Sequence, residues 1–223
     1  MSITGKIRKR SPEDYNEKIS TGTIELLVES EEDLVTLGKA KNVLPFEINT
    51  DQEVREDLRL EYRFLDLRNE KLHNNILLRS KILKTLRDKM DELGFAEIQT
   101  PILANSSPEG ARDYLVPSRL HAGKFYALPQ APQQFKQLLM VGGIDKYYQI
   151  APCFRDEDPR ADRLYGDFYQ LDLERAFVED GEEIRTEMEV LIQNLVTDFA
   201  GKALVTSEIP RIAYEDAIKI KRP

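Results

Sequence analysis

The sequence predicts an α+β fold, in which a mostly antiparallel set of strands carries helices on one side. Two observations predict this class. Apolar residues recur at helical intervals from residue 57 to residue 94, and alternating apolar and polar residues then mark several strands between residues 95 and 177. A chain of 223 residues is long enough to bury one core together with a small additional module.

A separate group of short strands is expected in residues 1–30, where Ile24, Leu26 and Val28 alternate along the chain. Because an isolated hairpin is only marginally stable, these strands must belong to a larger barrel or pack on the residues that follow. A proline and an acidic run then mark a linker between Pro45 and Glu56.

The first long helix is expected to end at Gly94, because glycine readily adopts the left-handed conformation that caps helices. Strands are expected at residues 95–102, 124–128, 147–154 and 168–177, with one helix near 132–141 and a final amphipathic helix. The apolar residues that define the two long helices are Ile76, Leu78, Ile82, Leu83, Leu86, Met90 and Leu93 in the first, and Ile184, Met188, Leu191, Ile192, Leu195 and Phe199 in the last.

The composition excludes several classes of protein. With 41% hydrophobic and 32% charged residues the chain is not a disordered one, and no apolar run approaches the roughly 20 residues that cross a bilayer. The first ten residues have no apolar stretch of the kind found in secretory signals. The single cysteine, Cys153, excludes an internal disulfide and suits a reducing, cytoplasmic compartment.

The net charge of −8 does not exclude a nucleic-acid partner, because polyanions bind to local positive charge. Basic residues gather at positions 6–10 and 219–222. Each group also fits a solvated chain end, so charge alone does not decide between these readings.

The strand at 168–177 has one apolar and one polar face. Its alternation puts Gln170, Asp172 and Glu174 on the polar face and Tyr169, Leu171 and Leu173 on the other. The polar face is either the solvated side of an antiparallel sheet or a binding surface.

Two groups of polar residues border this strand. Arg155, at the end of the preceding strand, has the planar fork of donors that clamps a phosphate, although a network with the acids at 156–158 explains it equally well. Gln133, Gln134 and Lys136 lie at a strand-to-helix turn, where helical N–H groups favour an anion, although they also fit ordinary helix capping.

Longer strings of residues point to a family. Residues 107–119 (SPEGARDYLVPSR), 125–130 (FYALPQ) and 135–139 (FKQLL) closely resemble bacterial-type aspartyl-tRNA synthetases, as do 147–150 (YYQI), 154–158 (FRDED) and 160–163 (RADR). The resemblance runs from about residue 54 to residue 199.

This resemblance implies a class II synthetase catalytic domain, with an antiparallel sheet flanked by helices. Residues 94–101 look like the first class II motif, which forms a homodimer interface with the helix before it, and residues 154–157 look like the second, ATP-binding motif. Residues 1–49 look like the closing strands of the OB-fold that grips the anticodon. Residues 50–223 would then be the N-terminal part of the catalytic domain.

The resemblance also implies an aminoacyl-tRNA ligase that makes aspartyl adenylate from L-aspartate and ATP and transfers the amino acid to tRNA(Asp). Arg155 would be catalytic, bridging the ATP α-phosphate and the substrate carboxylate, and Lys136 would pair with the aspartate side chain. The implied aspartate-binding residues are Glu109, Gln133, Lys136, Arg155 and Asp172, and the implied ATP-binding residues are Arg155, Asp156, Glu157, Arg163, Phe168 and Gln170.

The chemistry explains these residue types. Because the substrate carboxylate itself attacks the α-phosphorus, the protein supplies alignment and positive charge and needs no nucleophile. Asparagine in the aspartate pocket would leave the Lys136 charge buried and unpaired, at a cost of roughly 1–3 kcal/mol.

Magnesium is expected with ATP, but its ligands are expected beyond residue 223 and none within this chain. His73 and His121 lack metal-ligand spacing and are expected to be surface or structural residues. The expected setting is a cytoplasmic homodimer without membrane contact.

The sequence departs from the family at three places. The segment from Arg163 to Phe168 is one residue longer than usual, which weakens the assignment of Arg163, and we expect Gly166 to absorb the extra residue through a bulge. The first barrel strands are missing, and no glycine-rich third motif ending in arginine follows Phe168. We therefore expect a truncated or split form whose isolated 223 residues make no aspartyl adenylate.

Other functions fit parts of the pattern. The chain could represent a relaxed-specificity enzyme that also charges asparagine tRNA, or a lysyl or asparaginyl relative. It could also be a catalytically silent paralogue that acts as a binding or dimerisation module, which the missing third motif favours and the retained Glu109, Lys136, Arg155 and Phe168 disfavour.

Overall fold

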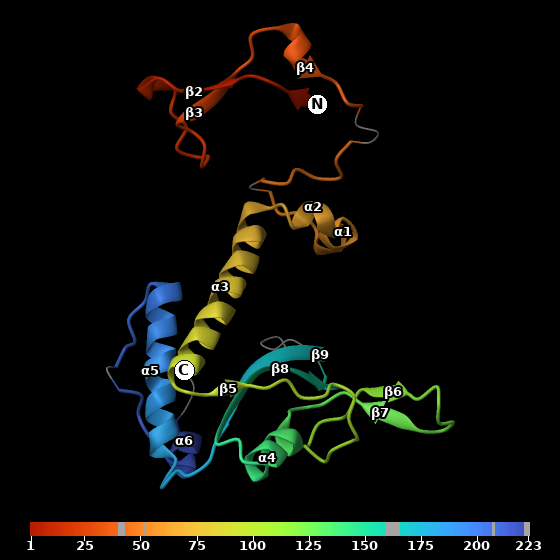
Figure 1. Ribbon diagram of the computed structural model, residues 1–223, viewed down its shortest axis with the longest axis vertical. Coiled ribbons are helices and arrows are strands. Elements are labelled where there is room, and N and C mark those ends of the chain that lie inside the picture. The colour runs from red at the N-terminus through yellow and green to blue at the C-terminus, as the bar shows by residue number, and fades with distance from the viewer. Residues whose placement is uncertain (40–42, 51, 159–165, 207, 221–223) are drawn as a thin grey trace. The chain divides into compact units, whose positions relative to one another are not determined.

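The computed structural model describes residues 1–39, 43–50, 52–158, 166–206 and 208–220 (Figure 1). The expected Arg163 lies outside these residues. The chain divides into two compact units, Met1–Leu72 and His73–Pro223. Each unit is described by itself.

The first unit contains two short antiparallel strand pairs. Strand β1 (Ser2–Ile3) pairs with β4 (Leu34–Val35), and β2 (Lys6–Lys9) pairs with β3 (Ile24–Leu27) (Figure 1). Two 3-10 turns, η1 (Pro12–Asp14) and η2 (Glu31–Asp33), connect them. The predicted strands of residues 1–30 are therefore present, whereas their membership of an OB-fold stays a prediction.

Two short helices follow, α1 (Glu56–Glu61) and α2 (Arg63–Asp66), before the long helix α3 (Glu70–Glu92) begins. The Asp66 carboxylate is buried and accepts from Arg59 Nε at 2.8 Å, with Arg63 as its second partner. Because a buried carboxylate needs compensating positive charge, the two arginines hold these helices together.

A three-stranded sheet forms the centre of the second unit, in the order β5-β8-β9. Strands β8 (Lys146–Arg155) and β9 (Gly166–Arg175) pair antiparallel over ten residues each, and β5 (Ala96–Glu97) adds parallel to β8. Strands β6 (Leu115–Pro117) and β7 (Phe125–Ala127) form a separate hairpin. The predicted strand at 95–102 is shorter because the Thr100 N–H donates to the Gln149 side chain instead of to strand backbone.

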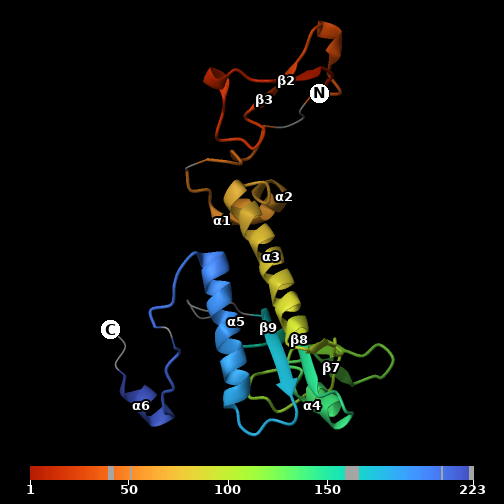
Figure 2. The same cartoon turned by 60° about the vertical axis from the view of Figure 1, so that its left-hand side comes forward.

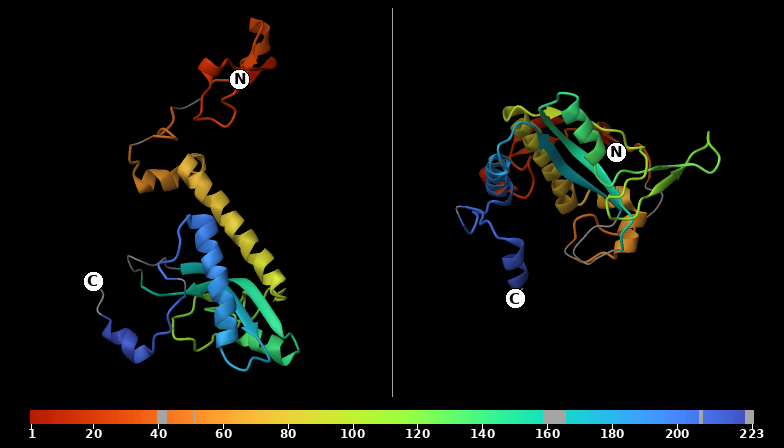
Figure 3. Two further views of the ribbon diagram at one scale, coloured as in Figure 1. Left: turned by 90° about the vertical axis from the view of Figure 1, so that its left-hand side faces the viewer. Right: turned by 90° about the horizontal axis from the view of Figure 1, so that it is seen from below.

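Helices cover both faces of this sheet, not one face as predicted. Helix α3 and helix α5 (Glu182–Ala200) pack on one face, and α4 (Gln133–Val141) lies on the other (Figure 3). From α4, the Lys136 side chain reaches Asp172 of β9. The charged contact between α4 and the polar face of β9 explains the difference from the sequence prediction. The last helix is α6 (Tyr214–Lys219) (Figure 2).

The hydrophobic core lies between the sheet and the α3–α5 pair. Met90, Phe95, Tyr148 and Leu191 are almost wholly buried there. Gly94 ends α3 with a φ of +78°, and the Phe95 N–H donates to the Met90 carbonyl at 3.0 Å. This confirms the predicted cap, because the left-handed turn at glycine directs Phe95 back into the core.

The pleat of β8 and β9 separates this core from the candidate site. Leu171 and Leu173 pack against the core, whereas Asp172 and Glu174 contact Lys136 on the opposite face. The predicted alternation of β9 is therefore confirmed. The described residues include no helix with the length and apolarity that crossing a membrane requires.

Candidate functional site

An ion-pair cluster lies on the polar face of the sheet, where Lys136 meets two carboxylates. Its Nζ is 2.9 Å from Asp172 Oδ1 and 3.2 Å from Glu174 Oε2. The Lys136 and Asp172 side chains are only 12% and 13% exposed, which removes much of the screening that weakens surface ion pairs. Burial lowers the pKa of Lys136, but its hydrogen bonds and attraction to both carboxylates outweigh burial and raise that pKa overall.

Arg155 and Phe168 lie further along the same face. The Arg155 guanidinium carbon is 5.1 Å from the centroid of the Phe168 ring, which is within range of a cation–π contact. Phe168 is four residues before Asp172 on β9, about 13 Å along a strand. The face therefore presents a planar cation and an aromatic ring at one end and a paired ammonium at the other.

The register of β8 and β9 places further side chains of β8 on this face. Cys153 is directly opposite Phe168, and its Sγ is 3.2 Å from Gln170 Oε1. Gln149 is directly opposite Asp172, and Tyr147 is opposite Glu174. Sequence reasoning missed Tyr147 and Gln149 as members of this face, although the alternation of β8 in antiparallel register with β9 was a signal that could have found them.

The loop around Glu109 borders the face and is held by a buried amide. Gln130, which is 1% exposed, accepts from the Ala111 N–H at 3.1 Å and donates to the Ala111 carbonyl at 2.9 Å. Glu109 is exposed and lines a small pocket together with Asp113, Gln134 and residues that flank the β7–α4 turn.

The acidic residues that follow Arg155 contact Arg112, whereas the sequence also allowed a network between them and Arg155. Arg112 donates through Nε to the Asp156 carbonyl at 3.1 Å, and its Nη2 lies 3.4 Å from Asp158 Oδ1. Within the described residues Arg155 makes no ion pair with these acids, so its charge is not taken up by them. The contact that Arg155 makes within the described residues is the one with the Phe168 ring.

The structure thus brings some of the predicted site residues together and leaves others apart. Lys136 and Asp172 are in contact, Arg155 and Phe168 are in contact, and Gln170 lies between the two pairs on β9. Gln133 begins α4, one turn before Lys136 on the same side of the helix. Glu157 is exposed, and Asp156 is fixed by the backbone bridge to Arg112. The roles of all these residues stay predictions.

The expected bulge at Gly166 is not present in the described part of the ladder. Each β8 residue pairs with one β9 residue as far as Arg155 and Gly166. Gly166 instead begins the strand with a φ of +88°, a conformation that favours glycine.

Magnesium finds no ready site in the described part of the chain. No group of three or more histidine, cysteine or acidic side chains gathers there. The two carboxylates on the polar face of β9, Asp172 and Glu174, both form ion pairs with Lys136.

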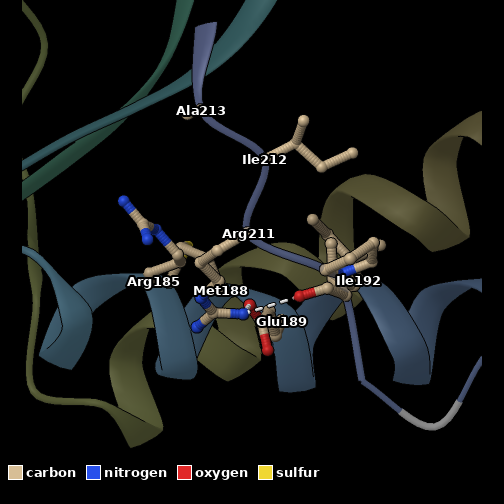
Figure 4. Close-up of a pocket in the computed structure, with 9 residues that line it drawn as sticks. Arg185, Met188, Glu189, Ile192, Arg211, Ile212 and Ala213 are labelled. Atoms are coloured by element: carbon tan, nitrogen blue, oxygen red, sulfur yellow. Dashed lines mark hydrogen bonds and ion pairs between the residues drawn. The ribbon is translucent and has the colours of Figure 1, made fainter. Parts of the chain in front are cut away.

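A second pocket of about 560 Å³ lies between α5 and the segment at 209–213 (Figure 4). Arg211 reaches across it to Glu189, and its Nη2 lies 2.9 Å from Glu182. No predicted site residue lines this pocket, and its cation is already neutralised.

Alkaline pH is expected to destabilise the fold through groups buried in and beneath the face. Burial raises the pKa of Cys153 from 9.0 to about 11 and that of Tyr148 from 10.0 to about 12, and it also raises the pKa of Tyr147. The folded chain therefore holds these protons more tightly than the unfolded chain, so their full stabilisation is present below pH 9 and is lost as the pH rises.

Each group should lower the free energy of unfolding by about 1.4 kcal/mol per pH unit between its unfolded and folded pKa. Denaturant titrations at pH 8, 9 and 10 should show a fall that Cys153→Ala reduces between pH 9 and 10. A stability that stays constant to pH 10, or a fall that is unchanged in Cys153→Ala, would contradict the assignment.

Comparison with known proteins identifies the family. The family of class II tRNA synthetases for aspartate, lysine and asparagine (D, K and N) matches residues 55–222. The chain is 56% identical over 218 residues to an aspartate–tRNA(Asp/Asn) ligase of Pelagibacter ubique (strain HTCC1062), covering 98% of this chain and 36% of that protein. It is 57% identical over 216 residues to the ligase of the same name from Paracoccus denitrificans (strain Pd 1222), covering 97% and 36%.

The chain thus spans about a third of the length of these relatives. Among solved structures, one described as an aspartyl-tRNA synthetase of Leishmania major Friedlin matches with a TM-score of 0.71 and 24% identity, covering 87% of this chain and 38% of that one. The structural likeness confirms the predicted α+β fold. On the family match, which covers most of its length, the chain belongs to the class II tRNA synthetases of the aspartate, lysine and asparagine group.

Proposed function

We propose that the face between Lys136 and Arg155 is part of a site that activates L-aspartate with ATP and transfers it to tRNA(Asp). The observation that supports this most directly is the placement of both cations on one face of the β8–β9 pair, with Phe168 beside Arg155. An adenylate needs such an arrangement, because its acidic side chain and its phosphate lie at different points of one molecule. The identity to named aspartate–tRNA ligases supports the same substrate.

In the proposed reaction the substrate α-carboxylate attacks the α-phosphorus of ATP, a carboxyl–phosphate bond forms, and pyrophosphate leaves. Arg155 aligns the two reacting groups with its fork of donors and offsets the negative charge that grows between them. Phe168 would stack on the adenine, next to Gln170. Since the nucleophile belongs to the substrate, no protein residue has to supply one.

Lys136 gives selectivity for the acidic side chain in this proposal. Asp172 and Glu174 occupy two of its directions and leave a third donor of the ammonium available to a ligand. Asparagine offers only a neutral amide at this point, and the partly buried ammonium gains less from it.

The cofactors and partners follow from this reaction. ATP with magnesium, L-aspartate and tRNA(Asp) would be required, in the cytoplasm, where translation takes place. Residues 1–49 would bind the anticodon, and Ile76, Leu77 and Leu78 of α3, which are 39–48% exposed, suit the proposed homodimer interface. The names of the relatives also include tRNA(Asn), which supports its charging as a second candidate activity.

Direct binding tests the proposal. The chain should bind aspartyl sulfamoyl adenosine, a stable analogue of the adenylate, about 10- to 100-fold more tightly than the asparaginyl analogue. Isothermal titration calorimetry with both compounds measures this difference. Equal affinity for the two, or no saturable binding of either, would contradict the proposal, whereas the reading as a silent module predicts the second result.

A further inference from the structure

Two buried polar residues of β8 lie beside the carboxylates that hold Lys136, on the same face of the sheet. Tyr147 is 0% exposed and Gln149 is 4% exposed, and both project from β8 onto the polar face. In the strand register Tyr147 is opposite Glu174 and Gln149 is opposite Asp172. Opposed residues on one face of an antiparallel pair have neighbouring side chains, so these two residues lie next to the carboxylates of the cluster.

Hydrogen bonds fix the side chains of Tyr147 and Gln149. Gln149 Oε1 accepts the Thr100 backbone N–H at 2.9 Å and the Tyr147 hydroxyl at 3.3 Å. The shorter bond to the backbone fixes the amide of Gln149, because a buried amide oriented by main chain has little freedom to turn. The Tyr147 hydroxyl is thereby held against the Gln149 amide, beside the strand positions of Asp172 and Glu174.

Asp172 is the member of the cluster that needs such support. Its Oδ1 accepts from Lys136, whereas its buried Oδ2 has no hydrogen-bond partner among the described residues. The Tyr147 phenol lies close enough for burial and the Asp172 charge together to raise its pKa, so it stays protonated as a donor. The Tyr147 hydroxyl donates this proton to the amide oxygen of Gln149, the residue directly opposite Asp172 in the strand register.

We infer that Tyr147 is a positioning residue, which together with Gln149 fixes the Asp172 carboxylate and so directs the Lys136 ammonium toward the acidic side chain of the amino-acid substrate. The inference rests on the proposed function and extends it to two residues that touch no substrate. Tyr147 acts only through Asp172, so its influence is confined to the amino-acid end of the face. The nucleotide end, at Arg155 and Phe168, does not depend on it.

The next residue of β8 provides a matched control. Tyr148 is also 0% exposed, points to the opposite face, and has its hydroxyl 3.4 Å from Asp91 Oδ1. Tyr147→Phe and Tyr148→Phe therefore remove the same atom from equally buried rings on the same strand. A general loss of packing or stability should affect both variants, whereas a positioning role affects only the first.

The test measures the affinities of both variants for L-aspartate, for the aspartyl sulfamoyl analogue and for ATP. Tyr147→Phe should weaken aspartate and analogue binding about 5- to 10-fold, as the loss of one hydrogen bond predicts, and leave ATP binding unchanged. Tyr148→Phe should change none of these affinities. In an Asp172→Asn background the effect of Tyr147→Phe should vanish, because the residue through which it acts is already altered.

A second readout needs no ligand. The rate at which Lys136 is acetylated by an N-hydroxysuccinimide ester, followed by mass spectrometry, should rise in Tyr147→Phe and stay unchanged in Tyr148→Phe. If wild type binds aspartate and the two variants behave alike, the positioning role is overturned while the proposed function stands. If wild type binds no aspartate, the proposed function fails, and unchanged Lys136 labelling in Tyr147→Phe would then overturn the positioning role as well.

Discussion

Lys136→Met should weaken binding of the aspartyl sulfamoyl analogue by about 100-fold or more and lower the free energy of unfolding by about 3 kcal/mol. The ammonium lies 2.9 Å from Asp172 and 3.2 Å from Glu174, and the Asp172 side chain is 13% exposed. Removing the cation leaves two neighbouring carboxylates without compensating charge, and it also removes the group that we propose binds the substrate side chain. Calorimetric titration and denaturant unfolding measure the two effects.

Lys84→Met is the matched control for this variant. Lys84 forms an ion pair with Asp88 at 2.7 Å, but their side chains are 75% and 54% exposed. Its loss should cost only about 0.5 kcal/mol and leave binding unchanged, because exposed helical pairs contribute little. If the two variants lose equal stability and neither loses affinity, Lys136 is an ordinary surface lysine and the cluster carries no function.

Arg155→Lys should weaken ATP binding by about 30- to 100-fold, although the charge is kept. The guanidinium is planar, lies over the Phe168 ring, and can donate two parallel hydrogen bonds to a phosphate. An ammonium is a point charge that cannot do both. Because the Arg155 side chain makes no ion pair within the described residues, the unfolding free energy should change little.

Arg87→Lys serves as the control for Arg155→Lys. Arg87 Nε donates to both carboxylate oxygens of Glu97, at 3.1 and 3.0 Å, on a part of the chain remote in sequence from the candidate nucleotide end. The affinity of Arg87→Lys for ATP should equal that of the wild type. If the same titration showed that Arg155→Lys binds ATP as tightly as the wild type, residue 155 would not contact the phosphates.

Local patterns in the sequence predicted the elements that depend on local physics. The helical spacing of Leu86, Met90 and Leu93 and the glycine at 94 predicted where α3 ends, because periodicity and capping act within a few residues. The alternation of β9 likewise assigned Leu171 and Leu173 to the core and Asp172 to the opposite face. These features need no knowledge of distant partners.

Features that depend on long-range contacts escaped prediction. The shortness of β5 follows from a hydrogen bond between the Thr100 N–H and the Gln149 side chain, 49 residues away. The placement of α4 on the second face of the sheet follows from the pairing of Lys136 with Asp172. No pattern within either segment contains this information.

The candidate site shows the same division. The family resemblance named Lys136 and Asp172 separately as substrate-binding residues, but only the β8–β9 register and the position of α4 reveal that they bind each other. Tyr147 reads in sequence as one more apolar strand residue, and its position opposite Glu174, next to the ion-pair cluster, becomes visible only when the two strands are paired.

A crystal structure of the chain with aspartyl sulfamoyl adenosine tests the shared face most directly. Its side-chain carboxylate should lie within about 3.5 Å of the nitrogen at the end of Lys136, and its sulfamoyl group within the same reach of the Arg155 fork. Two results would contradict a common cleft for amino acid and nucleotide. In one, Lys136 and Arg155 contact different ligand molecules; in the other, the compound binds elsewhere and contacts neither residue.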